Sequence, residues 1–405
     1  MSLTVLPLRR APRSAASALA AVALLAAGCG TSSGDGDSSA TGGFKAPDLP
    51  QVDEIGAGEG ELNVLAWPGY AEDGSTDKKV DWVTPFEDKT GCEVNVKPFG
   101  TSDEAVSLMS KGGYDVVSAS GDASLRLIAA GDVEPVNTEL VPNYADIVPF
   151  LKDQAFNSVD GQMYGIPHGW GANLLMYRTD EVKPAPTSWS VVFDDASNYD
   201  GKVTAYDSPI YIADAALYLM KTQPDLGIEN PYALDQDQLA AAVDLLKVQK
   251  ESVGEYWADY TKEVDAFKSG SSVVGTTWQI IASLTEEDAP VEAILPEEGS
   301  TGWSDTWMVG ADSEHKNCAY QWLDWIASPQ VQAQVAEWFG EAPANPKACE
   351  FTTEGFCDTY HVTDEQYAEQ IWYWTTPIPE CLDGRTDVEC TTYADWTDAW
   401  TEIKG

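Results

Sequence analysis

The chain has 405 residues, enough for two ordinary domains, and carries 66 acidic residues against 23 basic ones, a formal net charge of −43. This excess of negative charge excludes nucleic acid and anionic lipid surfaces as expected partners, because both are themselves anionic. It is compatible with a cationic ligand and equally with a salt-tolerant, solvated surface, since charges are screened over ~8 Å at physiological salt.

Residues 1–28 have the pattern of a secretory signal peptide: three arginines precede an Ala/Leu-rich run that is too short to span a membrane. The small residues before Cys29 resemble a bacterial lipobox, in which the cysteine becomes the lipidated first residue of the mature protein. An ordinary signal with a chance cysteine is the alternative. Residues 29–59 are rich in Gly, Ser, Asp and Thr and are predicted to form a disordered tether. Without residues 1–28 the formal charge is 23 − 3 = 20 basic minus 66 acidic residues, or −46.

Six further cysteines follow Cys29, and an even number in an exported chain predicts disulfides. Fifteen connectivities are possible for six cysteines. We favour the local pairs Cys349–Cys357 and Cys381–Cys390, which leave Cys92–Cys318. The spacings do not resemble C-x-x-C metal sites and only three histidines occur, so neither a metal nor a cofactor is expected.

The first half of the remaining chain alternates strands and helices. Strands are predicted at 61–67, 92–97 and 114–117, and helices at 81–89, 102–110 and 125–130. This alternation predicts a parallel α/β sheet, in which ligands bind beyond the carboxyl ends of the strands. The side chains expected at those ends are Trp67, Tyr70, Ser120 and Asp122. For Asp122, capping of the following helix is the alternative role.

The second half continues with strands at 173–177, 203–207 and 272–278, and with helices at 212–220, 239–250, 318–326 and 330–339. Asp207 ends one of these strands and Trp278 follows another. Asp207 also precedes a helix, where a carboxylate commonly acts as a cap. Arg178 is the only basic residue that the sequence places near these positions.

Residues 302–307 place a carboxylate two residues after a large aromatic ring. If the segment is extended, Trp303 and Asp305 point to the same side, because side chains alternate along a strand. The ring attracts an organic cation by its quadrupole, and the carboxylate accepts hydrogen bonds from the cation's N–H groups. In the alternative interpretation, Trp303 and Trp307 are core residues and Asp305 caps a turn.

A series of short motifs occurs in a definite order between Leu62 and Gly405, at residues 64–70, 86–91, 113–117, 166–171, 188–189, 199–202, 278, 296–299 and 303–305. Their order resembles the spermidine/putrescine-binding proteins of bacterial ABC importers. The resemblance implies a type II periplasmic-binding-protein-like α/β fold, with two lobes and hinge crossovers near 170–173, 303–306 and 340–346. Lobe I would comprise 60–171 and 304–345, and lobe II 172–303 and 346–405.

The resemblance also implies roles for individual residues. The family's aromatic positions are matched by Trp67, Tyr70, Trp278 and Trp303, and its ammonium-binding carboxylates by Asp207 and Asp305. This chain departs from the family pattern in several places, so the exact amine stays open. Ile210 stands where the family has a second acid, Asp122 could replace a missing charge, and Gln279 stands where the family commonly has Asn. An insertion between Cys381 and Cys390 disturbs the alignment near Thr375.

The function implied by the resemblance is that of a monomeric substrate-binding lipoprotein at the extracellular face of the cell membrane, held there by its lipid alone. It would capture a polyamine between its lobes and deliver it to ABC permease subunits. The same fold binding a sugar, or another small amine such as γ-aminobutyrate, is the closest alternative. An enzyme is not expected, because no Gly-x-Ser-x-Gly elbow follows the predicted tether, no His-Glu-x-x-His motif occurs, and His168 is interpreted as a packed hinge residue. A purely structural lipoprotein would not need aromatic rings at four strand ends.

Overall fold

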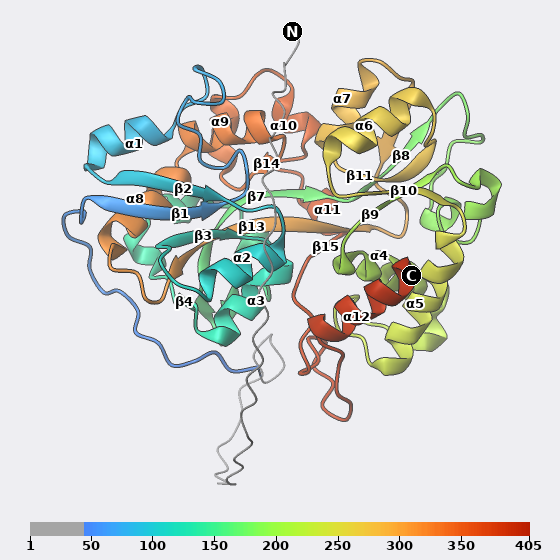
Figure 1. Cartoon of the computed structure of the whole chain (residues 1–405), viewed down its shortest axis with the longest axis horizontal. Helices are drawn as coiled ribbons and strands as arrows, with labels where there is room; N and C mark the ends of the chain where they lie inside the picture. Colours follow the sequence, from blue (N-terminus) through green and yellow to red (C-terminus); the bar gives the residue numbers. More distant parts are fainter. Residues whose placement is uncertain (1–43) are drawn as a thin grey trace, which may run out of the picture. The chain divides into compact units, whose positions relative to one another are not determined.

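The computed structural model of the protein describes residues 44–405 (Figure 1). The predicted signal peptide, the lipidation of Cys29 and the first part of the predicted tether lie outside the described residues. In the part of the chain that the structure describes, no helix is both long and apolar enough to cross a membrane.

The larger of two main sheets has eight strands, in the order β14-β7-β13-β3-β1-β2, with β4 and β15 also paired to β13. Its strands are β1 (Glu61–Ala66), β2 (Glu93–Pro98), β3 (Val116–Ala119), β4 (Val133–Glu134), β7 (Gly165–Ala172), β13 (Ser300–Gly310), β14 (Ala342–Pro343) and β15 (Ile371–Tyr373). The sheet buries both faces. On β1, Val64 packs in a core with helices α1 (Val83–Thr90), α8 (Lys316–Ile326) and α9 (Pro329–Phe339), and its neighbour Leu65 packs in another core with α2 (Ser102–Met109) and α3 (Gly121–Ala130).

The smaller sheet has five strands in the order β10-β9-β11-β8-β12. These are β8 (Leu174–Arg178), β9 (Val203–Tyr206), β10 (Val253–Trp257), β11 (Val274–Thr277) and β12 (Val291–Ile294). Helices α4 (Ile212–Thr222), α5 (Gln236–Lys250) and α12 (Tyr393–Lys404) contribute to the core on one face. Helices α6 (Tyr260–Ser269) and α7 (Gln279–Glu286) contribute to the core on the other (Figure 1). The remaining strands and α-helices are β5 (Ser158–Val159), β6 (Gln162–Met163), α10 (Phe356–Thr359) and α11 (Glu365–Ala368), and short 3-10 helices occur between the other elements.

Most predicted helices and strands are present with ends shifted by a few residues, and the parallel sheet predicted from residues 61–130 is found in β1, β2 and β3, but each main sheet as a whole is mixed. Strand β13 pairs antiparallel with β3 and β7, and β8 pairs antiparallel with β11 and β12. The parallel pairs β1·β2, β1·β3, β9·β10 and β9·β11 lie in the segments where strands alternate with helices, and β13·β15 is also parallel. The antiparallel strands instead follow or precede the points where the chain passes between the sheets.

The chain passes from one sheet to the other at Asn173, which separates β7 from β8, and between β12 and β13. Residues 300–302 pair with β15, and 302–308 with β7, so β13 belongs to the larger sheet from its first residue. The third passage follows β15. The second and third passages therefore lie before residue 300 and after residue 373, and not near 303–306 and 340–346 as expected. The reason is that residues 300–303 and 371–373 make their backbone hydrogen bonds within the larger sheet.

Residues 44–59, the described part of the predicted tether, contain no helix or strand but are packed against the protein. Phe44 and Val52 contact the cores of the larger sheet. Glu59 accepts hydrogen bonds from the backbone N–H groups of Asn317 and Cys318, at the start of α8. Disorder was the wrong expectation for this part, because its few apolar side chains and one carboxylate find partners that composition does not reveal.

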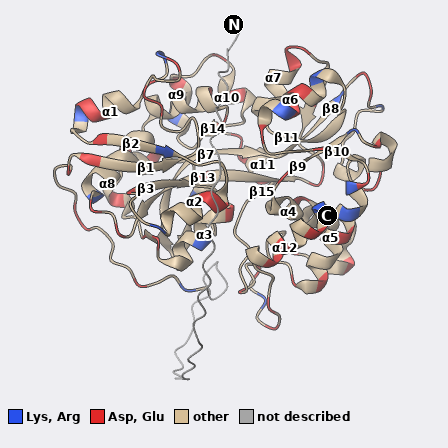
Figure 2. Cartoon of the chain, in the orientation of Figure 1, with Lys and Arg blue, Asp and Glu red and all other residues tan. Residues whose placement is uncertain are grey.

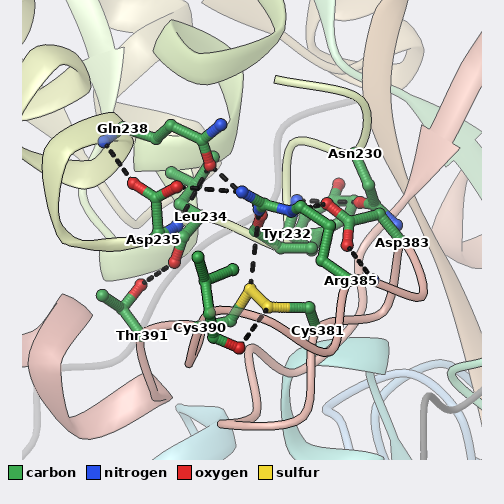
Figure 3. The surroundings of a disulfide bond; sticks show 12 residues. Asn230, Tyr232, Leu234, Asp235, Gln238, Cys381, Asp383, Arg385, Cys390 and Thr391 are labelled. Carbon is green, nitrogen blue, oxygen red and sulfur yellow. Dashed lines mark hydrogen bonds and ion pairs between the residues drawn. A yellow bond between two sulfur atoms is a disulfide. The ribbon is translucent and has the colours of Figure 1, made fainter. Parts of the chain in front are cut away.

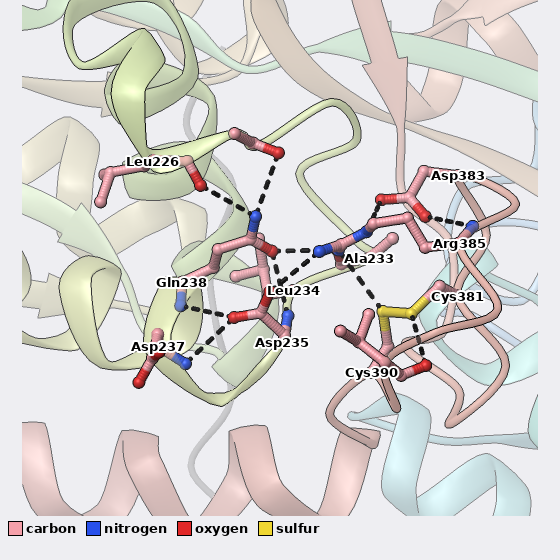
Figure 4. Close-up of polar contacts among 12 residues, drawn as sticks. Leu226, Ala233, Leu234, Asp235, Asp237, Gln238, Cys381, Asp383, Arg385 and Cys390 are labelled. Carbon is pink, nitrogen blue, oxygen red and sulfur yellow. Dashed lines mark hydrogen bonds and ion pairs between the residues drawn. A yellow bond between two sulfur atoms is a disulfide. The ribbon is translucent and has the colours of Figure 1, made fainter.

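The three expected disulfides, Cys92–Cys318, Cys349–Cys357 and Cys381–Cys390, are confirmed. The last one closes a loop that is joined to α5 by Arg385 (Figure 3). The Arg385 guanidinium donates to the carboxylate of Asp235, to the side-chain oxygen of Gln238 and to the carboxylate of Asp383 (Figure 4). Asp235 is the N-cap of α5 and forms a capping box with Gln238. Acidic residues are spread over helices and loops around both sheets (Figure 2).

A buried polar network lies at the first passage between the sheets. Asp214 on α4 accepts a hydrogen bond from Thr301 at 3.0 Å, and the Asn173 amide lies 2.7 Å from the Thr301 hydroxyl. Burial raises the pKa of Asp214 to about 7, although Thr301 and Asn173 oppose the shift. The carboxyl group is therefore held partly protonated near neutral pH.

We expect Asp214 to make the protein less stable as pH rises. A carboxyl group whose pKa is higher in the folded than in the unfolded chain stabilises the fold fully below the unfolded pKa, and that stabilisation is lost as pH rises toward the folded value. Here the window runs from 3.8 to about 7. Chemical denaturation of the wild type and of Asp214→Asn across this window should show a flatter decline for the variant. Parallel curves would contradict the assignment.

Candidate ligand-binding site

The site is built on β13, where Trp303 and Asp305 are both buried and lie on one face of the strand. Opposite them on β7 are Gly171, paired with Trp303, and Gly169, paired with Asp305. A Cβ atom on Gly171 would lie 2.9 Å from the Trp303 ring, and one on Gly169 would overlap the carboxylate of Glu341. The glycines of this motif are therefore needed for the close approach of a ring and a carboxylate to the strand.

Tyr70 joins Asp305 to a second buried carboxylate that the sequence analysis missed. The Tyr70 hydroxyl lies 2.7 Å from Oδ2 of Asp305 and 2.8 Å from Oε2 of Glu341. His168 places Nε2 at 3.5 Å from the other Glu341 oxygen. All four side chains are buried. Tyr70 also packs against Phe339 with ring centroids 4.5 Å apart, which fixes the orientation of its hydroxyl.

Burial controls the ionisation of these groups. It raises the pKa of Asp305 to about 6, although the hydroxyls of Ser120 and Tyr70 oppose the shift, and it raises the pKa of Glu341 well above its usual range. Burial also lowers the pKa of His168 to about 3, so its imidazole is neutral near pH 7 and does not balance the carboxylates. Within residues 44–405, no lysine or arginine forms an ion pair with Asp305 or Glu341. The pair is suited to an external positive charge.

Aromatic rings line the approach to the two carboxylates. The ring centroids of Trp278 and Trp303 lie 6.1 Å apart, and the Trp278 indole N–H donates to the side-chain oxygen of Asn173 at 3.0 Å. The ring of Tyr206, at the end of β9, has its centroid 5.5 Å from that of Trp278, and it stacks on Trp374 with a centroid distance of 5.6 Å. The sequence analysis missed Tyr206 and Trp374. Tyr206 precedes Asp207 at the end of the predicted strand 203–207, and this position could have indicated that it belongs to the site.

A small cavity adjoins this aromatic group. Its lining includes Trp278, Trp303 and Glu341, together with Gln279, Tyr360 and Tyr367. Gln279 therefore has access to the same space. Thr375, by contrast, donates its hydroxyl to the backbone oxygen of Tyr373. Among the described residues, no group of three or more His, Cys, Asp or Glu side chains is arranged to hold a metal ion.

Three predicted residues lie together at the ends of β1 and β3. The indole N–H of Trp67 donates to Ser120 at 3.2 Å. Asp122, buried in the first turn of α3, accepts hydrogen bonds from Ser102 at 2.8 Å and from Tyr393 at 3.3 Å. Burial raises its pKa, and its charge in turn raises the pKa of Asp305. Asp122 therefore adds to the negative potential at Asp305 from a separate element.

Asp207 has a different environment from Asp305. Its carboxylate lies 2.9 Å from the Lys404 ammonium and accepts a hydrogen bond from the Trp400 indole at 3.2 Å. The Lys404 ammonium also lies 4.0 Å from the centre of the Tyr256 ring. The expectation that Arg178 is the only nearby basic residue is therefore wrong, because α12 brings Lys404 from the end of the chain to Asp207. Arg178 itself pairs with Asp180.

This contact predicts unequal effects of the two proposed carboxylates. Asp207→Ala should weaken amine binding by much less than Asp305→Ala, because Asp207 already has a positive partner whereas Asp305 has none. The Asp207–Lys404 pair is partly exposed, and exposed ion pairs contribute only ~0–1 kcal/mol, so a small effect is expected when Asp207 is removed. Titration of both variants with the same amine measures the difference. Equal losses for the two variants would show that Lys404 leaves Asp207 when ligand binds.

The two sheets, the passages between them and the enclosed aromatic and acidic site define the class: a two-lobe α/β solute-binding protein of the periplasmic type. The chain belongs to the bacterial extracellular solute-binding protein family, whose model matches residues 81–356. This is a family of binding proteins and not of enzymes.

The chain is similar to the putrescine-binding periplasmic protein SpuD of Pseudomonas aeruginosa, with 24% identity over 361 residues that cover 85% of this chain and 91% of that protein. Its fold matches a putative spermidine/putrescine ABC transporter protein from Listeria monocytogenes, with a TM-score of 0.68, 19% identity, and coverage of 85% and 99% of the two chains. The Atu4243-GABA receptor also has this fold, with a TM-score of 0.62, 18% identity, and coverage of 85% and 98%. These likenesses confirm the expected fold class.

Proposed function

We propose that the protein is the substrate-binding component of a bacterial ABC importer and that its ligand is a polyamine. The observation that carries the proposal is the buried Asp305 and Glu341 pair, which has no basic partner among residues 44–405 and lies beside aromatic rings. A polyamine is a string of ammonium groups on methylene spacers, and it needs carboxylates at intervals with apolar walls between them. The similarity to SpuD supports the same ligand class.

In this proposal, ligand enters between two lobes that correspond to the two sheets, with boundaries near 60–171 and 304–345 for lobe I and 172–303 and 346–405 for lobe II. The pairing of 300–303 and 371–373 with the larger sheet favours moving those segments to lobe I. Trp278 and Trp303 stack on the methylene chain, Asp305 accepts from one ammonium group, and Tyr70, Trp67, Ser120 and Asp122 complete that end of the site. Asp207 lies at the other end and contributes less, because it is paired with Lys404. Closure then presents both lobes of a monomer to permease subunits.

Calorimetric titration of residues 44–405 tests the ligand class, using putrescine, spermidine, spermine, γ-aminobutyrate, choline and maltose. Residues 44–59 are included because they pack against the cores. We expect tight one-to-one binding of a polyamine with a change in tryptophan fluorescence. A response to maltose alone would replace the polyamine by a sugar. A response to γ-aminobutyrate alone would favour the ligand in the name of the structurally similar receptor.

We also propose that Cys29 carries the lipid that holds the protein at the outer face of the membrane. Cys29→Ser should abolish incorporation of labelled fatty acid and release the protein from the membrane fraction, because a cysteine sulfur is needed for lipidation and ~0.8 kcal/mol per buried CH₂ of the acyl chains is then lost. Cys29 is the test position, and Ser32→Ala in the same region is the control. Unchanged membrane association of Cys29→Ser would contradict the anchor.

A further inference from the structure

The contacts of the Tyr70 hydroxyl imply that Tyr70, Asp305 and Glu341 together hold an additional proton. This oxygen lies 2.7 Å from Asp305 and 2.8 Å from Glu341. A phenol has one O–H donor and therefore donates to only one of the two carboxyl groups. The second contact is a hydrogen bond only if that carboxyl group is itself protonated and donates to the phenol oxygen. Both distances are satisfied when the three groups share two protons.

The surroundings favour retention of that proton. Asp122 on α3 adds negative charge near Asp305. His168 on β7 contacts Glu341 but is neutral near pH 7, since burial lowers its pKa to about 3. Tyr206 on β9 and Tyr360 are uncharged phenols whose pKa values are raised mainly by burial and further by nearby carboxylates. No lysine or arginine of residues 44–405 pairs with either carboxyl group. A proton is the one positive charge available to them.

Glu341 is also placed where a ligand can reach it. It follows α9 directly after Gly340, and it lines the cavity that Trp278 and Trp303 also line. Its carboxylate fits against Gly169, where any larger side chain would overlap it. Glu341 thus contacts the Tyr70 hydroxyl and belongs to the lining of the cavity beside the aromatic rings.

We propose that Glu341 is an ammonium-binding residue of this site, and that Tyr70, Asp305 and Glu341 share a proton that the ligand's ammonium group displaces. The inference depends on the proposed function and deepens it. In the exchange, the carboxyl O–H bond breaks and its proton passes to solvent. The ammonium group then donates an N–H hydrogen bond to the resulting carboxylate, so charge is conserved. Amine affinity consequently rises with pH through the range in which the shared proton is lost.

Calorimetry of amine binding in buffers with different ionisation enthalpies tests the exchange. Measured near pH 7, where Asp305 with its pKa of about 6 is mostly ionised and only the shared proton remains, the wild type should release close to one proton per amine bound. Glu341→Gln should lose most of this release and bind the amine ~10-fold or more weakly, because an amide accepts a weaker hydrogen bond from a cation. Glu337→Gln, an exposed glutamate on α9, is the matched control and should retain both values.

The outcomes separate the two proposals. Tight amine binding by the wild type without proton release would overturn the exchange and leave the proposed function standing. Absence of amine binding by the wild type would overturn the proposed function itself. If Glu341→Gln does not fold, Tyr70→Phe supplies the second test, because removing the hydroxyl separates the two carboxyl groups and should change the number of protons released. An unchanged number in folded Tyr70→Phe would overturn the shared proton.

Discussion

Replacing Asp305 by alanine is expected to weaken binding of the best amine by ~30-fold to several thousand-fold. Truncating one partner of a buried charge pair costs ~2–5 kcal/mol, because the remaining charge is left buried and unpaired. Asp305 is 4% exposed, and its carboxylate has no basic partner in the described part of the chain. Calorimetric titration of wild type and variant with one amine measures the ratio.

The same substitution should leave the fold intact. Without Asp305, the Tyr70 hydroxyl still has Glu341 as an acceptor, and a buried carboxyl group whose pKa burial raises to about 6 is removed. Asp305→Asn, which keeps the volume but not the charge, separates loss of charge from loss of packing. Asp312→Ala, an exposed acid just beyond β13, is the control and should bind normally. Wild-type affinity of Asp305→Ala would remove Asp305 from the proposed site.

Among the three disulfides, Cys92–Cys318 is expected to cause the largest loss of unfolding free energy when it is broken. In the chain-entropy description of disulfides, the stabilisation grows with the closed loop. This bond joins residues 226 apart, whereas Cys349 and Cys357 are 8 apart. The double variant Cys92→Ala/Cys318→Ala should therefore lose about 5 kcal/mol of unfolding free energy, against about 2.5 for Cys349→Ala/Cys357→Ala.

Equilibrium unfolding in guanidinium chloride, followed by tryptophan fluorescence, compares the two double variants with the wild type. Buried Trp322 on α8 lies close to the longer loop closure, since α8 contains Cys318. Similar losses for both double variants would contradict an effect of loop length. The affinity for amine should be retained in both folded variants, because neither cysteine pair belongs to the site.

The antiparallel strands illustrate where the sequence was a poor guide. The helices and strands in residues 61–130 could be predicted, because apolar residues recur with the period of each element. Parallel pairing of the strands then follows, because a helix connects each strand to the next. Strand β13 has no such signal: all of its residues are buried, yet it contains Ser, Thr, Gly and Asp. Some of its polar side chains have partners distant in sequence, such as Asp214 for Thr301.

The sequence by itself determined those features that depend on near neighbours along the chain. These are the helices and strands with clear periodicity, the two local disulfides, and the common face of Trp303 and Asp305, which alternation along an extended strand requires. The order of motifs along the chain also pointed to the family before any contact was known. Each of these features can be predicted from the sequence, because it depends on residues a few positions apart or on the order of motifs along the chain.

Only the tertiary structure decided which groups meet and which are buried. Glu341 reaches Tyr70 across 271 residues, and Lys404 reaches Asp207 from the last turn of α12. Tyr206 and Trp374 stack although one ends β9 and the other follows β15. Burial and charge pairing are properties of the folded surroundings, and they set both the raised pKa of Asp305 and the screening of Asp207 by a lysine. Asp207 and Asp305 were both predicted to bind ammonium groups, but the fold gives them different burial and different charged neighbours.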